Sequence, residues 1–130
     1  MRATYVDSSA LDTLVVYEAE TEALRKFLAS TDQMTSSLVT RVELSRAVAR
    51  RLPEAGAAAQ AVLDSLVIVG LDARIATRAG SLAPASVRSL DAIHLATALE
   101  LGAELTAFVC YDDRLCAAAA ALGLPVVSPS

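Results

Sequence analysis

Short apolar segments rich in strand-forming residues alternate with longer segments that carry apolar residues at helical spacing, and this alternation runs along the whole chain. Strands are predicted at 3–6, 34–38, 65–69, 106–109 and 125–127. Helices are predicted at 8–14, 18–29, 39–52, 54–63, 72–78 and 91–101, and from 112 to about 123. Strands separated by helices pair in parallel, and the helices cover both faces of the sheet. The expected fold is α/β: a three-layer α/β/α sandwich around a mainly parallel sheet of four to five strands.

The composition predicts one packed domain over residues 1–130. A chain of 130 residues, 55% of them hydrophobic, can fill one core, and such a composition excludes a disordered chain. No apolar run approaches the ~18 residues needed to span a bilayer. The first residues, MRATYVDSS, lack the long apolar stretch of a signal peptide. We therefore expect a cytoplasmic protein with no membrane association.

The two cysteines are not expected to form a disulfide. Cys110 ends a predicted strand, and Cys116 lies in the helix that follows. Across a strand–helix turn, the two side chains are expected to point in different directions, which disfavours both a disulfide and a zinc site shared with the histidine. They are interpreted as small buried hydrophobic residues.

Four acidic residues, Asp7, Glu43, Asp91 and Asp112, each lie where a predicted strand ends or a helix begins. In an open parallel sheet such positions gather at the carboxyl edge, where ligands bind. Two unit charges ~4 Å apart repel by roughly 4 kcal/mol at an effective dielectric constant of ~20. A cluster of this kind therefore needs a bound cation or retained protons, and carboxylate oxygens suit Mg²⁺ and Mn²⁺.

Each acid also has a purely structural interpretation. Asp7 can cap the helix that follows it, and Asp91 can stabilise a helix start through the helix dipole. Glu43 can be a solvated surface residue. Asp112 and Asp113 open the last helix together, so one of them caps the helix and the other carboxylate has no structural task.

Several polar residues lie near the predicted cluster. His94 follows Asp91 by three residues and is interpreted as a packed, hydrogen-bonded imidazole, with a metal ligand or base as the alternative. Ser8, Ser9 and Thr40 either orient ligands or cap helices.

The cations are almost all guanidinium groups, which bind phosphate well. Lys26 is the only lysine beside ten arginines, and the net charge of −4 equals the charge of the four proposed ligands. Candidate phosphate contacts are Arg41, Arg46, Arg50, Arg51, Arg88 and Arg114, and a solvated face is the alternative.

Four segments together resemble the PIN domain family, and most closely the VapC-type toxin ribonucleases of bacterial toxin–antitoxin pairs. They read YVDSSAL, LVTRVELSRAV, SLDAIHLATALELGA and FVCYDDRLCAAAAALGLPVV, and the resemblance covers nearly the full length. It places the family's acidic residues at Asp7, Glu43, Asp91 and Asp112, with Asp113 as an alternative to the last. One departure is Cys110, where the family usually has a small hydroxyl residue.

The resemblance implies hydrolysis of RNA phosphodiester bonds with Mg²⁺ or Mn²⁺. Asp7 and Asp91 would hold the ion, while Asp112 and Glu43 would orient water or hold a second ion. It also implies a homodimer and a cognate VapB-type antitoxin whose arginine-bearing tail can reach the acidic pocket. A catalytically inert PIN-like module that binds RNA or protein is the main alternative. A phosphorelay receiver would need a lysine late in the chain, whereas Lys26 lies early.

Overall fold

A computed structural model describes residues 2–130, and all five of its strands belong to one sheet in the order β3-β2-β1-β4-β5. Every pair of neighbouring strands is parallel. The strands are β1 (Ala3–Val6), β2 (Met34–Ser37), β3 (Val67–Val69), β4 (Leu105–Val109) and β5 (Val126–Val127). The parallel sheet expected from the sequence is confirmed, and all its strands end at one edge.

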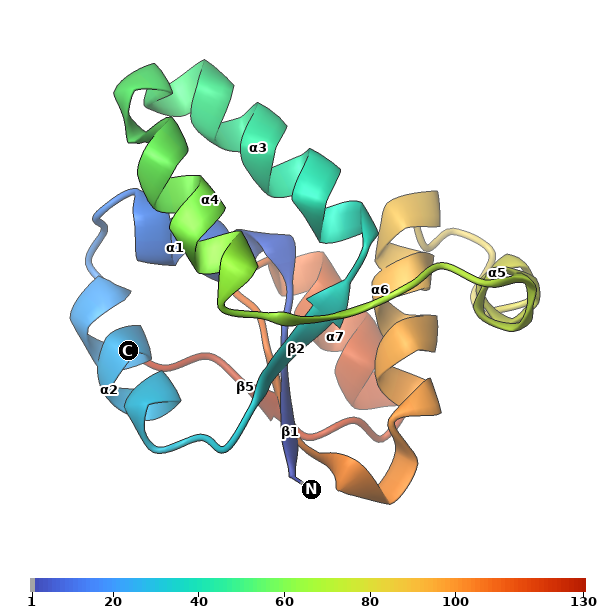
Figure 1. The fold of residues 1–130 in the computed structure, drawn as a ribbon. Helices are drawn as coiled ribbons and strands as arrows, with labels where there is room; N and C mark the ends of the chain where they lie inside the picture. Colours follow the sequence, from blue (N-terminus) through green and yellow to red (C-terminus); the bar gives the residue numbers. More distant parts are fainter. Residues whose placement is uncertain (1) are drawn as a thin grey trace.

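Helices cover both faces of this sheet (Figure 1). They are α1 (Ser8–Val15), α2 (Thr21–Ala29), α3 (Val39–Arg51), α4 (Gly56–Asp64), α5 (Ala73–Gly80), α6 (Ser89–Glu100) and α7 (Asp113–Ala121), with short 3-10 turns at Pro53–Ala55 and Gly102–Glu104. Helices α1 to α4 contribute to one core, α6 and α7 contribute to the other, and α5 packs against α6. None of the helices within residues 2–130 has both the length and the apolar character needed to cross a membrane.

Alternate residues of the central strands supply the two cores. Val6 and Val109 point into the core beneath α1 to α4, whereas Tyr5 and Phe108 point toward α6 and α7. The rings of Tyr5 and Phe108 stack with centroids 5.1 Å apart. Since side chains along a strand alternate in direction, Asp7, two residues after Tyr5, is directed toward α6. The strand pattern thus determines which layer faces the first acidic residue.

Three of the helices begin with an aspartate as the N-cap residue. Each of these aspartates follows an apolar strand, which is where the sequence predicts a helix to start. The carboxylates of Asp7, Asp72 and Asp112 accept hydrogen bonds from backbone N–H groups at 2.9, 2.9 and 3.0 Å. Asp91 is different: α6 begins at Ser89, so Asp91 lies in its first turn and is not the cap residue. The predicted start of this helix at Asp91 was wrong, and the carboxylate of Asp91 is free for other contacts.

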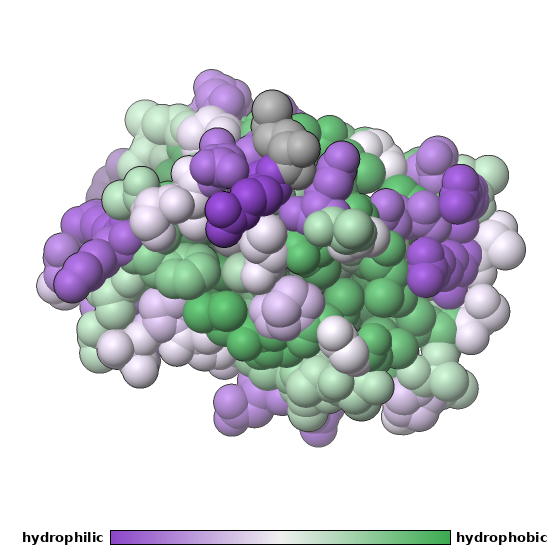
Figure 2. Space-filling model, turned by 90° about the horizontal axis from the view of Figure 1, so that it is seen from below, coloured by the Kyte–Doolittle hydropathy of each residue, from purple (hydrophilic) through white to green (hydrophobic). Residues whose placement is uncertain are grey.

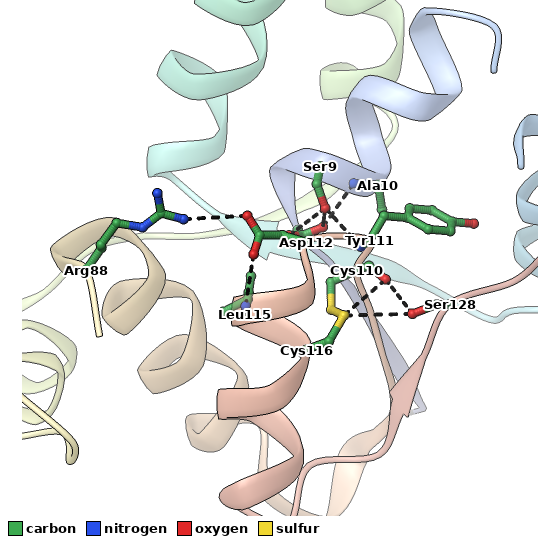
Figure 3. The surroundings of a disulfide bond; sticks show 10 residues. Ser9, Ala10, Arg88, Cys110, Tyr111, Asp112, Leu115, Cys116 and Ser128 are labelled. Carbon is green, nitrogen blue, oxygen red and sulfur yellow. Dashed lines mark hydrogen bonds and ion pairs between the residues drawn. A yellow bond between two sulfur atoms is a disulfide. The ribbon is translucent and has the colours of Figure 1, made fainter. Parts of the chain in front are cut away.

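Cys110 and Cys116 form a disulfide, contrary to the sequence-based expectation. The turn after β4 folds the start of α7 back beside the strand end, so the two Cα atoms lie 6.2 Å apart, within the usual range for a disulfide. Figure 3 shows the pair next to Ser128, whose hydroxyl donates to the carbonyl oxygen of Cys110 at 2.7 Å. The prediction failed because a six-residue separation does not reveal how tightly the chain reverses.

Apolar residues also reach the surface. Figure 2 shows a face on which apolar residues cover the middle, while the most hydrophilic residues gather at both sides and along the upper edge. The larger exposed apolar side chains include Leu38, Val42, Leu71 and Leu90. Leu38 is joined to the end of the edge strand β3, because its N–H donates to the carbonyl oxygen of Val69 at 2.9 Å. These four residues follow strands β2 and β3 or lie near the starts of α3 and α6, and are called here the apolar edge.

Candidate active site

A cavity of about 390 Å³ lies beyond the carboxyl ends of the central strands. Its walls come from four separate segments: the start of α1, the N-terminal halves of α3 and α6, and the turn before α7. The lining includes Asp7, Ser8, Ser9, Glu43, Arg88, Asp91, His94 and Asp112. All four acidic residues singled out in the sequence therefore line one cavity, here called the acidic cavity.

Asp7 forms the floor of the acidic cavity and is only 3% exposed. Its position is fixed by β4, since its N–H donates to the carbonyl oxygen of Val109 at 3.1 Å. The hydroxyl of Ser9 donates to both carboxylate oxygens of Asp7, at 2.8 and 2.9 Å. Burial raises the pKa of Asp7 from 3.8 to about 6, although these hydrogen bonds and nearby His94 oppose the rise. The protein thus holds a poorly solvated carboxylate in a fixed orientation.

Glu43 and His94 form a second fixed group. The Nε2 atom of His94 lies 2.6 Å from Oε1 of Glu43, and its Nδ1 atom lies 2.6 Å from the hydroxyl oxygen of Tyr5. The hydroxyl of Ser8 donates to the same Oε1 atom at 2.7 Å. Burial alone would raise the pKa of Glu43, but the hydrogen bond and charge of His94, with the Ser8 bond, hold it below its usual value. Glu43 is therefore kept as an oriented, ionised carboxylate.

Asp91 and Asp112 form the outer wall and are held by one arginine. The Nε atom of Arg88 lies 3.3 Å from Asp91, and an Nη atom of the same side chain lies 3.5 Å from Asp112. Figure 3 shows Arg88 extending across to Asp112. The Arg88 side chain is 60% exposed, so these contacts are weakly held. Asp113 is exposed and does not line the cavity, which identifies Asp112 as the acidic residue of this segment that does.

Other sequence-based interpretations have mixed outcomes. His94 is the packed, hydrogen-bonded imidazole that was expected, and it lines the cavity as well. Thr40 is not at the cavity, because it is buried and its hydroxyl pairs with Ser36 at 2.8 Å. Sequence reasoning missed Tyr5, which looks like an ordinary residue of an apolar strand. Only the alternation that directs Tyr5 and Asp7 to the same side could have identified it.

The donor set fits a hard divalent cation in its chemistry, since all four acidic residues offer oxygen ligands. Within residues 2–130, however, no three Asp, Glu, His or Cys side chains converge closely enough to share one ion. Glu43 pairs with His94, and both Asp91 and Asp112 pair with Arg88. Of these contacts, the exposed ones of Arg88 are the easier to exchange.

Comparison with known proteins identifies the family of this chain. A family profile described as PIN domain matches residues 4–121. The chain is 42% identical over 130 residues to Ribonuclease VapC46 of Mycobacterium tuberculosis (strain ATCC 25618 / H37Rv), with 100% of each chain covered.

Two solved structures share the fold. VapC20 of Mycobacterium tuberculosis, described as a Sarcin-Ricin loop cleaving toxin, has a TM-score of 0.78 at 19% identity, covering 97% of this chain and 99% of that one. A toxin–antitoxin complex from Klebsiella pneumoniae has a TM-score of 0.74 at 24% identity, covering 98% of both chains. The chain therefore belongs to the PIN domain family and, within that family, to the VapC type.

Proposed function

We propose that this protein is a divalent-metal-dependent ribonuclease and the toxin of a toxin–antitoxin pair. The observation that carries the proposal is the gathering of Asp7, Glu43, Asp91 and Asp112 in one cavity. These residues come from four distant segments, and Asp7 is buried there as a carboxylate with a raised pKa. Such a cluster is costly unless it binds cations, and hydrolysis of phosphodiesters is a reaction that uses them. Full-length similarity to a VapC ribonuclease supports the same activity.

In this proposal Asp7 and Asp91 would hold Mg²⁺ or Mn²⁺, and Asp112 would be a further ligand in place of its contact with Arg88. The ion would neutralise charge on the phosphoryl oxygens and promote attack by water. Asp7 suits this role because it is held by Ser9 and by backbone, so little reorganisation is needed. Arg88 in turn is freed to approach the substrate phosphate.

Glu43 would orient the attacking water. Its Oε1 atom is occupied by Ser8 and His94, whereas no residue of the described chain donates a hydrogen bond to Oε2. A lowered pKa keeps Glu43 ionised near neutral pH, so Oε2 can accept a hydrogen bond from the attacking water and orient it. His94 and Tyr5 act through Glu43 by fixing its direction, so they are positioning residues.

The test is cleavage of RNA by the purified protein with Mg²⁺ or Mn²⁺ and with EDTA. Asp7→Asn and Asp91→Asn should each lower the cleavage rate at least a hundredfold, comparable to the loss of a preorganised electrostatic group. Asp113→Asn is the matched control, because it removes one negative charge beside Asp112 but outside the acidic cavity.

Parent-rate cleavage by Asp7→Asn in the presence of Mg²⁺ would show that the ligand assignment is wrong. If the parent protein cuts no RNA and its melting temperature does not respond to Mn²⁺, the chain is instead an inert PIN-like module that binds RNA or protein.

Two protein partners are part of the proposal. A second copy of the chain would cover the part of the apolar edge outside the α3 groove and the acidic cavity, at Leu38 and Leu71, giving a homodimer. A cognate VapB-type antitoxin is supported by the shared fold with the Klebsiella pneumoniae toxin–antitoxin complex. An antitoxin arginine could replace Arg88 between the outer carboxylates and block the cavity.

A further inference from the structure

Two grooves adjoin the acidic cavity, one on each side. A groove of about 640 Å³ runs along α3 and shares Ser8, Ser9, Glu43 and Leu90 with the cavity; we call it the α3 groove. A second groove of about 560 Å³, the α7 groove, shares Arg88 and Asp91. Each groove shares wall residues with the cavity and the two grooves share none with each other, so the carboxylates lie between them; we call the three adjoining hollows the trough.

Unpaired guanidinium groups line both ends of this trough. Arg46 and Arg50 lie one helical turn apart in the α3 groove, are exposed, and make no ion pair or hydrogen bond within the described residues. Arg114 in the α7 groove is likewise exposed and unpaired in that part of the chain. Arg51 is different, since Asp12 and Glu18 hold it. Three cationic side chains are thus available to an anionic ligand.

The walls of the grooves indicate how that ligand would be held. The described residues that line them include no aromatic side chain, so bases cannot stack on protein rings there. The α7 groove is mostly apolar, with Val87, Ala117 and Ala121 among its lining residues. Binding must therefore depend mainly on backbone phosphates, for which guanidinium groups are well suited.

We propose that a single RNA strand lies along this trough across the acidic cavity. Phosphates on one side of the scissile bond contact Arg46 and Arg50, and phosphates on the other side contact Arg114. An RNA strand fits better than an acidic protein segment, because a strand cut at the carboxylates must continue past them in both directions. This inference rests on the proposed nuclease function and adds to it the path of the substrate.

The first test measures binding of a labelled single-stranded RNA by fluorescence anisotropy over a range of salt concentrations. It uses chains that carry Asp91→Asn, in EDTA, so that the RNA stays intact. The parent background is compared with the triple variant Arg46→Gln/Arg50→Gln/Arg114→Gln. Each lost phosphate contact reduces the magnitude of the slope of log K against log salt by about 0.7 for a single strand. The salt dependence of the triple variant should therefore be weaker, with a slope smaller in magnitude by about 2 than that of the background.

The matched control is Arg25→Gln/Arg74→Gln/Arg78→Gln, which changes the net charge equally at arginines outside both grooves. Its slope should equal that of the background. Equal slopes for the groove triple and the background would overturn the proposed path. The proposed path would also be overturned if the triple variant of the groove arginines bound RNA normally but no longer bound an acidic protein partner.

The second test assigns each end of the strand to one groove. Shortening the RNA on either side of the scissile bond should raise KM for the active protein. Arg114→Gln should abolish the effect of shortening on one side only, and Arg46→Gln/Arg50→Gln should abolish it on the other side only. If neither end of the RNA affects KM, the strand does not follow the trough.

These experiments separate the path from the reaction. Cleavage with no dependence on the groove arginines would overturn the path alone. Arginine-dependent binding by a parent protein that does not cleave would overturn the nuclease proposal and leave the path in place.

Discussion

The inner and outer walls of the acidic cavity are built in different ways. Asp7 and Glu43 on the inner side are held by short hydrogen bonds from Ser9, Ser8 and His94, and His94 is only 2% exposed. The outer carboxylates are held by one arginine that is 60% exposed. Buried hydrogen-bonded networks fix geometry, whereas exposed ion pairs contribute little to stability. The inner wall is therefore preorganised, and the outer wall is free to rearrange around a ligand.

The largest expected effect on stability comes from breaking the inner wall. His94→Ala leaves the hydroxyl of Tyr5 and the carboxylate of Glu43 without their partner in a buried region. Unsatisfied buried polar groups and a cavity should together lower the free energy of unfolding by about 2–4 kcal/mol. Urea denaturation measures this loss, with His94→Gln as the variant that retains part of the hydrogen bonding. A loss below that of a typical surface substitution would show that the inner wall is not rigid.

A smaller effect of opposite sign is expected for Asp7→Asn in EDTA. Folded Asp7 keeps its proton up to a pKa of about 6, while the unfolded residue loses it near 3.8. The stability that the protonated form contributes is fully present below pH 3.8 and is lost as the pH rises through 6. Asparagine preserves the cap and carries no charge, so the variant should be about 1–3 kcal/mol more stable than the parent at neutral pH.

Urea denaturation at neutral pH and near pH 4 checks this prediction, because the gain should shrink as the pH falls. A stability difference that does not vary with pH would mean that the buried charge of Asp7 is not its cause.

The smallest stability effect is expected in the outer wall, at Arg88→Gln. Removing these exposed ion pairs should change the free energy of unfolding by less than about 0.5 kcal/mol. In the proposed metal site Arg88 would compete with the ion for Asp91 and Asp112, so the variant should bind Mn²⁺ roughly fivefold more tightly, equivalent to about 1 kcal/mol. Calorimetric titration measures the affinity, and Arg78→Gln, whose partner Glu100 lies outside the cavity, is the control. Unchanged Mn²⁺ affinity would mean that Arg88 and the ion do not compete.

Much of the fold could be predicted because its determinants are local. Strand β1 has the predicted limits, and the caps at Asp7 and Asp112 follow directly from an aspartate placed after an apolar strand. The gathering of the four carboxylates also followed, since parallel strands place their ends at one edge. The start of α6 was misplaced by two residues, because its N-cap is Arg88, which makes no capping hydrogen bond through its side chain, whereas Asp91 is a residue type typical of helix starts.

The contacts that could not be predicted from the sequence join side chains from segments far apart in the chain, and they depend on the directions in which those side chains point. The contact between Tyr5 and His94 joins a strand to a helix far along the chain, and no local pattern encodes it. The bridge of Arg88 to Asp112 and the approach of Cys116 to Cys110 depend on how tightly two loops turn. Such contacts are set by packing, which residue spacing alone does not fix.

The pairing of β1 with β4 has a consequence for when the protein becomes harmful. Ala3 lies beside Leu105 in this pairing, so the central strand lacks one neighbour until nearly the entire chain has been made. Asp112 follows later still. A nascent chain on the ribosome therefore holds only fragments of the acidic cavity, and a cell that makes this protein is exposed to the complete cavity only once translation has passed Asp112.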